Sequence, residues 1–490
     1  MLFNSVQFLV FLPIVALLYY LIPRKARSAW LLVVSYYFYM CWNPKYAVLI
    51  AISTMVTYFS GIGIEALWKK YPNQNRYAKC VVVASFAVNL GILIFFKYFN
   101  WLLGMAGTVL HLSFQSPFSF VLPVGISFYT FQALGYTIDI YRGKGKISAE
   151  KNIVRYALFV SFFPQLVAGP IERSGNLLTQ IEHIKDKKID CGEIRDGLCL
   201  MLYGFFLKLV IADRAAVLVD YVLEGYTYYG FVELAVAFVL FAIQILCDFN
   251  GYTVIARGAA QIFGIRLMDN FRQPYLATSI RDFWRRWHIS LTSWFTDYLY
   301  IPLGGSRKGT VRKMFNTMVV FLVSGLWHGA NGHFVIWGAL HGIYQNMAIV
   351  IQSVKDRLGV RDKKMCFGTR LFKMMITFIL VDIAWIFFRA DSFGMALAYL
   401  KQMTTAYQNV SLLSLNYAWF DWLILIVAVI IMLTVDILHE KGYRIRPWIY
   451  SESCGLGLRW IIYMGAFWTV LMLGVYGVAY DTSQFIYFQF

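Results

Sequence analysis

The chain starts with a long apolar run that decides its fold class. Residues 6–22 read VQFLVFLPIVALLYYLI, and residues 23–27, PRKAR, follow directly. The run approaches the ~20 residues that a helix needs to cross the ~30 Å hydrocarbon core of a bilayer. A cleavable signal peptide would place its basic residues before the apolar run. Because they follow it here, we expect a retained membrane helix whose N-terminus lies outside and whose far end lies in the cytoplasm.

The composition of the whole chain agrees with this start. The 490 residues are 59% hydrophobic and 14% charged, against about 25% charged in soluble domains. A soluble enzyme, a disordered chain and a secreted disulfide scaffold are therefore excluded. The formal net charge of +18 fits basic cytoplasmic loops, so we expect no nucleic-acid partner. None of the seven cysteines forms a CxxC pair, which argues against a disulfide framework or a zinc site.

Loop charges give the chain one orientation in the membrane. Lys and Arg gather in five loops and are missing from 100–120 and 404–420, so the basic loops should be cytoplasmic. We predict an all-α polytopic membrane protein with roughly 11–12 transmembrane helices in one membrane domain, 1–490. The basic loops are 65–79, 142–155, 303–313, 353–373 and 439–447, and the candidate spans are 6–22, 30–42, 46–64, 80–96, 122–141, 198–212, 231–247, 314–328, 334–350, 374–388, 422–438 and 461–476.

Two segments break the simple pattern. Residues 154–170 contain Pro164 and Gly169-Pro170, which interrupt a helix, and residues 248–303 are mixed and rich in Arg and Trp. Irregular backbone survives at membrane depth only when it is packed in protein or lines a wet cavity. We expect both to be re-entrant or interfacial segments around a funnel open to the cytoplasm.

Residues 281–291, RDFWRRWHISL, are the first candidate site. At 100° per residue, Arg281, Arg285 and His288 would share one helical face, beside an apolar face with Trp284 and Trp287. Such a surface suits a phosphate-bearing anionic donor next to a titratable histidine. An interfacial amphipathic helix whose arginines contact lipid phosphates is the alternative, and composition alone favours it.

Residues 324–331, SGLWHGAN, are the second candidate site. The fifteen residues from Lys313 to His328 would rise ~22 Å as a helix and place His328 deep in the membrane. Gly325 and Gly329 would allow close backbone approach or a helix break. His328 is then a candidate general base, or a histidine packed between helices. His333 and His341 follow at spacings that fit no zinc pattern, so we expect no metal.

Other ionisable residues fall in apolar stretches. Ion pairs between helices are the simplest account of them, although a transporter would use the same residue types as a relay. The GxSxG, Walker A and HExxH motifs are missing. The residues in question are Asp139, Glu172, Lys208, Asp248 and Asp382.

Seven stretches together resemble the membrane-bound O-acyltransferase superfamily, in its branch that acetylates bacterial polysaccharides such as alginate. The resemblance is strongest over 1–400 and leaves 401–490 as additional C-terminal transmembrane helices, and the chain departs from the usual pattern at Asn250 and Gly332-His333. The matching stretches are LPVGISFYTFQ (122–132), FFPQLVAGPI (162–171), CDFNGY (247–252), NF with PYL (270–276), DFWRRWHISL (282–291), DYLYIPLGG (297–305) and GLWHGAN (325–331), with a weaker match at 385–392.

The resemblance implies a helical fold around a central tunnel, with His328 as the superfamily's catalytic histidine and His288 as the second histidine of the bacterial branch. Further substrate- or donor-binding residues are then expected around this pair. They are Arg281, Arg285 and Arg286 for the donor phosphates, Trp287 and Trp327 beside the thioester, and Asn331, Asp248 and Asn250.

The resemblance therefore leads us to expect an O-acyltransferase of the bacterial cytoplasmic membrane with no bound cofactor. A cytoplasmic thioester, acetyl-CoA or an acyl-carrier-protein thioester, would supply an acyl group to an extracytoplasmic polysaccharide or cell-wall glycan. A secreted or periplasmic partner protein would complete the delivery. Two alternatives stay open: D-alanyl transfer to teichoic acid from a carrier protein, and, in another class, a polysaccharide or ion-coupled transporter.

Overall fold

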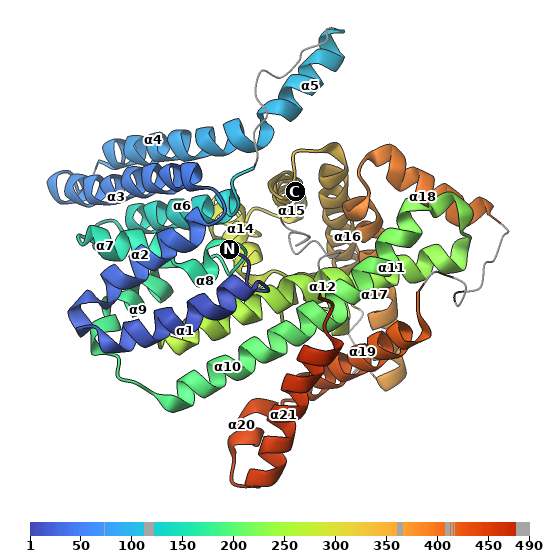
Figure 1. Ribbon diagram of the computed structural model, residues 1–490. Helices are drawn as coiled ribbons and strands as arrows, with labels where there is room; N and C mark the ends of the chain where they lie inside the picture. Colours follow the sequence, from blue (N-terminus) through green and yellow to red (C-terminus); the bar gives the residue numbers. More distant parts are fainter. Residues whose placement is uncertain are drawn as a thin grey trace. The chain divides into compact units, whose positions relative to one another are not determined.

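The computed structural model describes residues 1–72, 74–111, 122–359, 366–406, 412, 415 and 417–476. Within these ranges the regular elements are all helices (Figure 1). They fall into two compact units that interleave along the chain: residues 1–201 with 253–268, and residues 202–252 with 269–490. The predicted all-α membrane fold is therefore confirmed, and each unit is described by itself.

The first unit is built around three long helices, α3, α4 and α6, that pack side by side (Figure 1). The predicted interruption near Pro164 is present, since α7 ends at Ser161 and the short α8 begins at Phe163. Ser35 Oγ accepts the Phe163 N–H at 3.1 Å at the break. The helices of this unit are α1 (Val6–Leu21), α2 (Arg27–Met40), α3 (Ala47–Lys70), α4 (Asn75–Leu93), α5 (Phe99–Leu110), α6 (Ile126–Gly143), α7 (Ile153–Ser161), α8 (Phe163–Leu166), α9 (Thr179–Glu182) and most of α10 (Cys191–Phe205).

The second unit carries both candidate sites on two short helices and a helical hairpin. The short helices α13 and α14 contain the first site, and α15 ends at His328. The π-helices η6 (Phe206–Ala212) and η9 (Thr296–Tyr300) extend the helical framework. The α-helices are α11 (Asp213–Glu224), most of α12 (Phe231–Ile262), α13 (Ile280–Arg286), α14 (Ile289–Phe295), α15 (Thr310–His328), α16 (Gly332–Arg357), α17 (Phe367–Arg389), α18 (Phe393–Thr405), α19 (Trp419–Glu440), α20 (Ile445–Tyr450) and α21 (Leu456–Leu473).

Seven helices in the described ranges are long and apolar enough to cross a membrane. They correspond to seven of the twelve predicted spans, and the other five predicted spans lie on helices that are shorter or more polar. A multi-pass membrane protein is thus established. The seven are 44–70, 75–110, 231–262, 332–357, 367–389, 419–440 and 456–473.

The predicted irregular segment 248–303 is wrong at its start, because α12 continues without a break to Ile262. The polar residues in this part of α12 do not mark the end of a helix. They have hydrogen-bond partners within the unit to which each belongs. In the first unit, for example, Gln261 Nε2 donates to Asp196 Oδ2 at 2.7 Å. Glycine also lets this stretch pack closely, since a Cβ at Gly251 would lie 2.9 Å from Gly204 O in the second unit. The remainder, 269–303, has no spanning helix, as predicted, and forms only short helices.

Glycines bring α15 and α16 into backbone contact. A Cβ built at Gly325 would lie 2.3 Å from Phe334 O, and one at Gly338 would lie 2.3 Å from Phe321 O. Gly325 on α15 and Gly329 directly after it have the same four-residue spacing as Gly338 and Gly342 on α16. Small residues four apart allow membrane helices to approach each other this closely. The predicted close backbone approach is confirmed at Gly325, and the predicted alternative of a helix break applies at Gly329, where α15 ends.

Gly325→Ala should destabilise the protein by at least the ~1–3 kcal/mol typical of overpacking, because the new methyl group meets a backbone carbonyl that cannot move aside. Thermal unfolding of the detergent-solubilised protein measures this. Gly465→Ala on α21 is the matched control, since nothing lies within 4 Å of its Cβ. Equal melting midpoints for the two variants would contradict the close packing.

The basic loops should lie in the cytoplasm, because moving Lys and Arg across the membrane is unfavourable. In a background without the seven native cysteines, a cysteine at exposed His111, in the loop 100–120 that has no Lys or Arg, should react with a membrane-impermeant maleimide on intact cells. One at exposed Ser306 should react only after permeabilisation. The reverse pattern would invert the assigned orientation. The loop parts 112–120, 407–411, 413, 414 and 416 lie outside the described residues.

Candidate active site

His328 lies at the end of α15, enclosed by aromatic rings of the second unit. It is 4% exposed. Trp337 of α16 meets it edge to face at 4.9 Å between ring centroids, and Phe388 of α17 lies at 5.4 Å. Trp327 lies at 5.0 Å. Edge-to-face contacts of this kind hold a ring in one orientation, so the imidazole is held in an apolar surround.

His288 lies beside His328, and the resemblance stated above implies that both histidines line one tunnel. Their ring centroids are 6.4 Å apart, and Trp327 lies against both rings, at 5.9 Å from His288. Phe249 of α12 meets His288 edge to face at 4.8 Å. Burial lowers the pKa of His288 to about 3, so the imidazole is neutral at cellular pH.

The helical face predicted for Arg281, Arg285 and His288 is wrong. Helix α13 ends at Arg286, and His288 itself adopts a left-handed backbone with φ of 45° before α14 begins. Arg281 and Arg285 are exposed, whereas His288 is fully buried. A left-handed conformation costs a non-glycine residue about 1–2 kcal/mol. It also turns the His288 side chain away from the arginines and into the protein.

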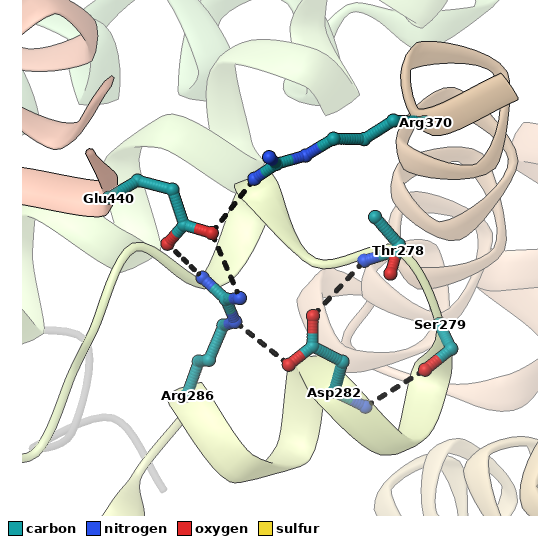
Figure 2. A network of polar contacts seen from close by, with 6 residues as sticks. All are labelled: Thr278, Ser279, Asp282, Arg286, Arg370 and Glu440. Carbon is teal, nitrogen blue, oxygen red and sulfur yellow. Dashed lines mark hydrogen bonds and ion pairs between the residues drawn. The ribbon is translucent and has the colours of Figure 1, made fainter. Parts of the chain in front are cut away.

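Arg286 belongs to an ion-pair network rather than to the exposed arginine surface (Figure 2). Its guanidinium donates to Asp282 Oδ1 at 2.9 Å and to Glu440 Oε2, at the end of α19, at 2.6 Å. Arg370 of α17 shares Glu440, at 2.9 Å. Two cations and two carboxylates thus neutralise one another. Arg281 and Arg285 have no ion pair within the described part of the chain.

The start of α13 is fixed in the same network (Figure 2). Ser279 Oγ accepts the Asp282 N–H at 3.1 Å, and Asp282 Oδ2 accepts the Thr278 N–H at 3.2 Å. This reciprocal arrangement satisfies N-terminal donors that have no partner inside the helix. The segment leading to His288 is therefore anchored at both ends of α13.

The two predicted tryptophans lie in different surroundings. Trp327 contacts both histidines, as above. Trp287 packs with Phe271 at 4.9 Å, Phe283 at 5.4 Å and Trp385 at 5.1 Å between ring centroids. Its described ring contacts place it in the support of the site rather than against the histidine pair.

Asp248 forms a buried ion pair, as the simpler sequence interpretation predicts. Lys208 Nζ lies 2.6 Å from Asp248 and 2.7 Å from Asp213, and all three side chains are at most 4% exposed. Since successive helix residues point 100° apart, Asp248 and Asn250 flank Phe249, which is the α12 residue that meets His288. Asn331 is the N-cap residue of α16, in the turn that follows His328, and its Nδ2 donates to Asp391 O at 3.2 Å.

The remaining histidines of α16 have protein partners. His333 Nδ1 lies 3.0 Å from Phe387 O, and Trp284 Nε1 donates to His341 Nδ1 at 3.2 Å. Trp337 separates His341 from His328. These contacts build the wall behind His328.

Several residues around the histidines escaped the sequence analysis. The aromatic wall of Phe249, Trp337 and Phe388 is one group, and Asn270 and Glu440, which hold the segment around His288, are another. The sequence did contain a signal for Trp337. It directly precedes Gly338, and Gly338 and Gly342 have the same four-residue spacing as Gly325 and Gly329 beside His328. No local pattern connects Glu440 with Arg286, 154 residues earlier.

Known proteins place this chain in a family. The model of the membrane-bound O-acyltransferase family matches residues 148–380. A probable alginate O-acetylase of Pseudomonas putida is 34% identical over the full length of both chains. A peptidoglycan O-acetyltransferase of Helicobacter pylori is 34% identical over 82% of this chain and 80% of its own length. A teichoic acid D-alanyltransferase of Bacillus subtilis is 26% identical over 46% of this chain and 59% of its own.

The chain belongs to the membrane-bound O-acyltransferase family. It is a multi-pass bacterial membrane enzyme that catalyses O-acyl transfer, which confirms the predicted enzyme class.

Glu440→Gln should destabilise the second unit, because Arg286 and Arg370 lose the charge they share. Hydrogen bonds to charged groups contribute about 1.5–3 kcal/mol when partly buried, and the Glu440 side chain is 22% exposed. Thermal unfolding measures the loss. Glu452→Gln, at an exposed glutamate, is the control. If Glu440→Gln and the control both unfold at the wild-type temperature, the ion-pair network does not anchor α13.

Proposed function

We propose that this protein transfers an acyl group, most simply acetyl, from a cytoplasmic thioester to a hydroxyl of an extracytoplasmic polysaccharide or cell-wall glycan. The observation that carries the proposal is the buried pair of imidazoles, His288 and His328, 6.4 Å apart within an aromatic surround. Such a site excludes bulk water, which would otherwise hydrolyse a thioester.

His328 is the general base of the proposed reaction. Its imidazole takes the proton of the acceptor hydroxyl while that oxygen attacks the thioester carbonyl carbon. A C–O bond forms, the C–S bond breaks, and the thiolate leaves with the electron pair and takes up a proton. His288, being neutral, binds and orients by hydrogen bonding rather than by charge. No serine or cysteine acyl-enzyme is required.

The donor is a thioester that carries phosphate, such as acetyl-CoA or an acyl-carrier-protein thioester. Arg281 and Arg285 support this because they are exposed and carry charge that no carboxylate of the described chain neutralises. Arginine binds phosphate strongly through paired N–H donors. Arg286 is assigned instead to the anchoring of α13 through Asp282 and Glu440.

The relatives support the proposed acceptor and location. Full-length similarity to a probable alginate O-acetylase, with a peptidoglycan O-acetyltransferase at equal identity, supports a polymer outside the cytoplasmic membrane as the acceptor. A cytoplasmic donor and an external acceptor require a passage through the protein, lined by the histidine pair. A secreted or periplasmic partner would carry the group to the polymer.

D-alanyl transfer from a carrier protein is the second candidate, because a teichoic acid D-alanyltransferase also matches. Its similarity covers less than half of this chain, which favours the acetyl branch. Purified protein supplied with labelled acetyl-CoA or with a D-alanyl carrier protein separates the two. A polysaccharide transporter would consume neither thioester.

His328→Ala should lower acyl transfer by about 10²–10⁴-fold, because removal of a general base costs that much. Product is counted as labelled acetyl groups on the polymer. His183→Ala, at an exposed histidine, is the control and should leave transfer unchanged. More than about a tenth of wild-type transfer in the His328→Ala protein would exclude the general-base role.

The double variant Arg281→Gln/Arg285→Gln should raise the donor KM with little change in kcat, because these residues would contact phosphate rather than the reacting carbon. Steady-state kinetics with varied donor concentration measure both constants. Lys185→Gln/Lys187→Gln removes two positive charges elsewhere and controls for net charge. A fall in kcat at constant KM would contradict the phosphate assignment.

A further inference from the structure

The start of helix α14 poses a capping problem next to His288. The first N–H groups of a helix have no acceptor within it, and a residue at the N-cap position usually supplies one from its side chain. Here the N-cap is His288, whose side chain makes no capping hydrogen bond. The N–H groups of Ile289 and Ser290 therefore need an acceptor from elsewhere.

Asn270 supplies both acceptors from a distant part of the sequence. Its backbone oxygen accepts the Ile289 N–H at 2.9 Å, and its side-chain Oδ1 accepts the Ser290 N–H at 3.3 Å. A third bond runs in parallel, from the Arg272 N–H to Arg286 O at 2.9 Å. The segment 270–272 thus holds the chain on both sides of His288.

This attachment matters because the backbone of His288 is strained. Its φ of 45° lies in the left-handed region, and the side chain is fully buried. Such a conformation persists only where surrounding contacts enforce it. Because Asn270 accepts the first N–H groups of α14, the helix begins at Ile289 and does not extend to His288. The His288 ring therefore stays in contact with Phe249 and Trp327.

We propose that Asn270 is a positioning residue of the acyl-transfer site, which holds the imidazole of His288 at its distance from His328. The role rests on the proposed function, since it acts through the histidine pair. Asn270 is 1% exposed, so its carboxamide is not a surface contact. The polar segment 270–272 is thereby part of the site, although none of its side chains is assigned to the reaction.

Two substitutions separate the acceptor from the donor of the carboxamide. Asn270→Asp keeps an oxygen for the Ser290 N–H and removes the NH₂ group, whereas Asn270→Ala removes both. We expect Asn270→Ala to lower kcat by about 10²-fold, the loss that a ~1 Å misplacement produces, with donor KM changed less than about threefold. Asn270→Asp should keep most of the turnover.

A double variant tests whether Asn270 acts through His288. When two residues act as one unit, their losses do not multiply. Asn270→Ala combined with His288→Ala should therefore be no slower than His288→Ala alone. Asn89→Ala is the control, because Asn89 is an equally buried asparagine of the first unit, bonded to Ser53. Asn89→Ala should lower the stability of the protein. It should leave kcat unchanged, both in the wild-type protein and when it is combined with His288→Ala.

Losses that multiply in the double variant would overturn the proposal. An Asn270→Asp protein that folds but turns over as slowly as His288→Ala would also overturn it, since the NH₂ group would then be the part required. If Asn270→Ala fails to fold, the isosteric Asn270→Asp variant decides alone. Wild-type protein that transfers no acyl group refutes the proposed function instead, and this outcome is visible before any variant is made.

Discussion

Backbone contact between α15 and α16 is the constraint on which the site depends. Lipid offers no hydrophobic force to bring two apolar helices together, so close packing must supply the attraction. The glycine spacing on each helix removes the Cβ atoms that would hold the backbones apart, with Gly325 against Phe334 O and Gly338 against Phe321 O. His328 and Trp337 project from the two helices at this contact and meet at 4.9 Å. A wider separation would open the wall around His328.

The site combines one rigid wall with one strained turn. The His328 side is built from helix packing, where aromatic rings fix the imidazole. The His288 side is irregular backbone. Its left-handed residue is held by the hydrogen bonds that the N–H groups of Ile289 and Ser290 donate to Asn270, and by the ion pairs of Arg286 (Figure 2). Irregular backbone at a membrane site is tolerated when its polar groups are satisfied by protein. The short helices α13 and α14 meet this condition through capping at both N-termini.

Periodicity and loop charge were sufficient for the helical fold and for the position of His328 at the far end of a helix. The depth argument needed only the distance from Lys313 along one helix, and α15 runs from Thr310 to His328 as that argument requires. The same reasoning failed for α12, because its polar residues after Cys247 are buried against neighbouring helices, which a one-dimensional pattern cannot reveal. It also failed for the arginines, since a helical face assumes a continuous helix and α13 ends before His288. The partners of Arg286 and His288 come from residues 440 and 270, and only the folded chain brings them together.

The C-terminal helices take on a role that the motifs do not indicate. The resemblance to the family is strongest before residue 400, yet Glu440 at the end of α19 pairs with both Arg286 and Arg370. Without that carboxylate, Asp282, which also pairs with Arg286, would be left to offset two guanidiniums. Asp282 and Glu440 together balance these two cations, so the charge of α13 that has no ion pair in the described part of the chain lies on Arg281 and Arg285, its two exposed positions. Under the proposed function, a helix outside the matching stretches thereby bears on where along this segment an anionic donor is attracted.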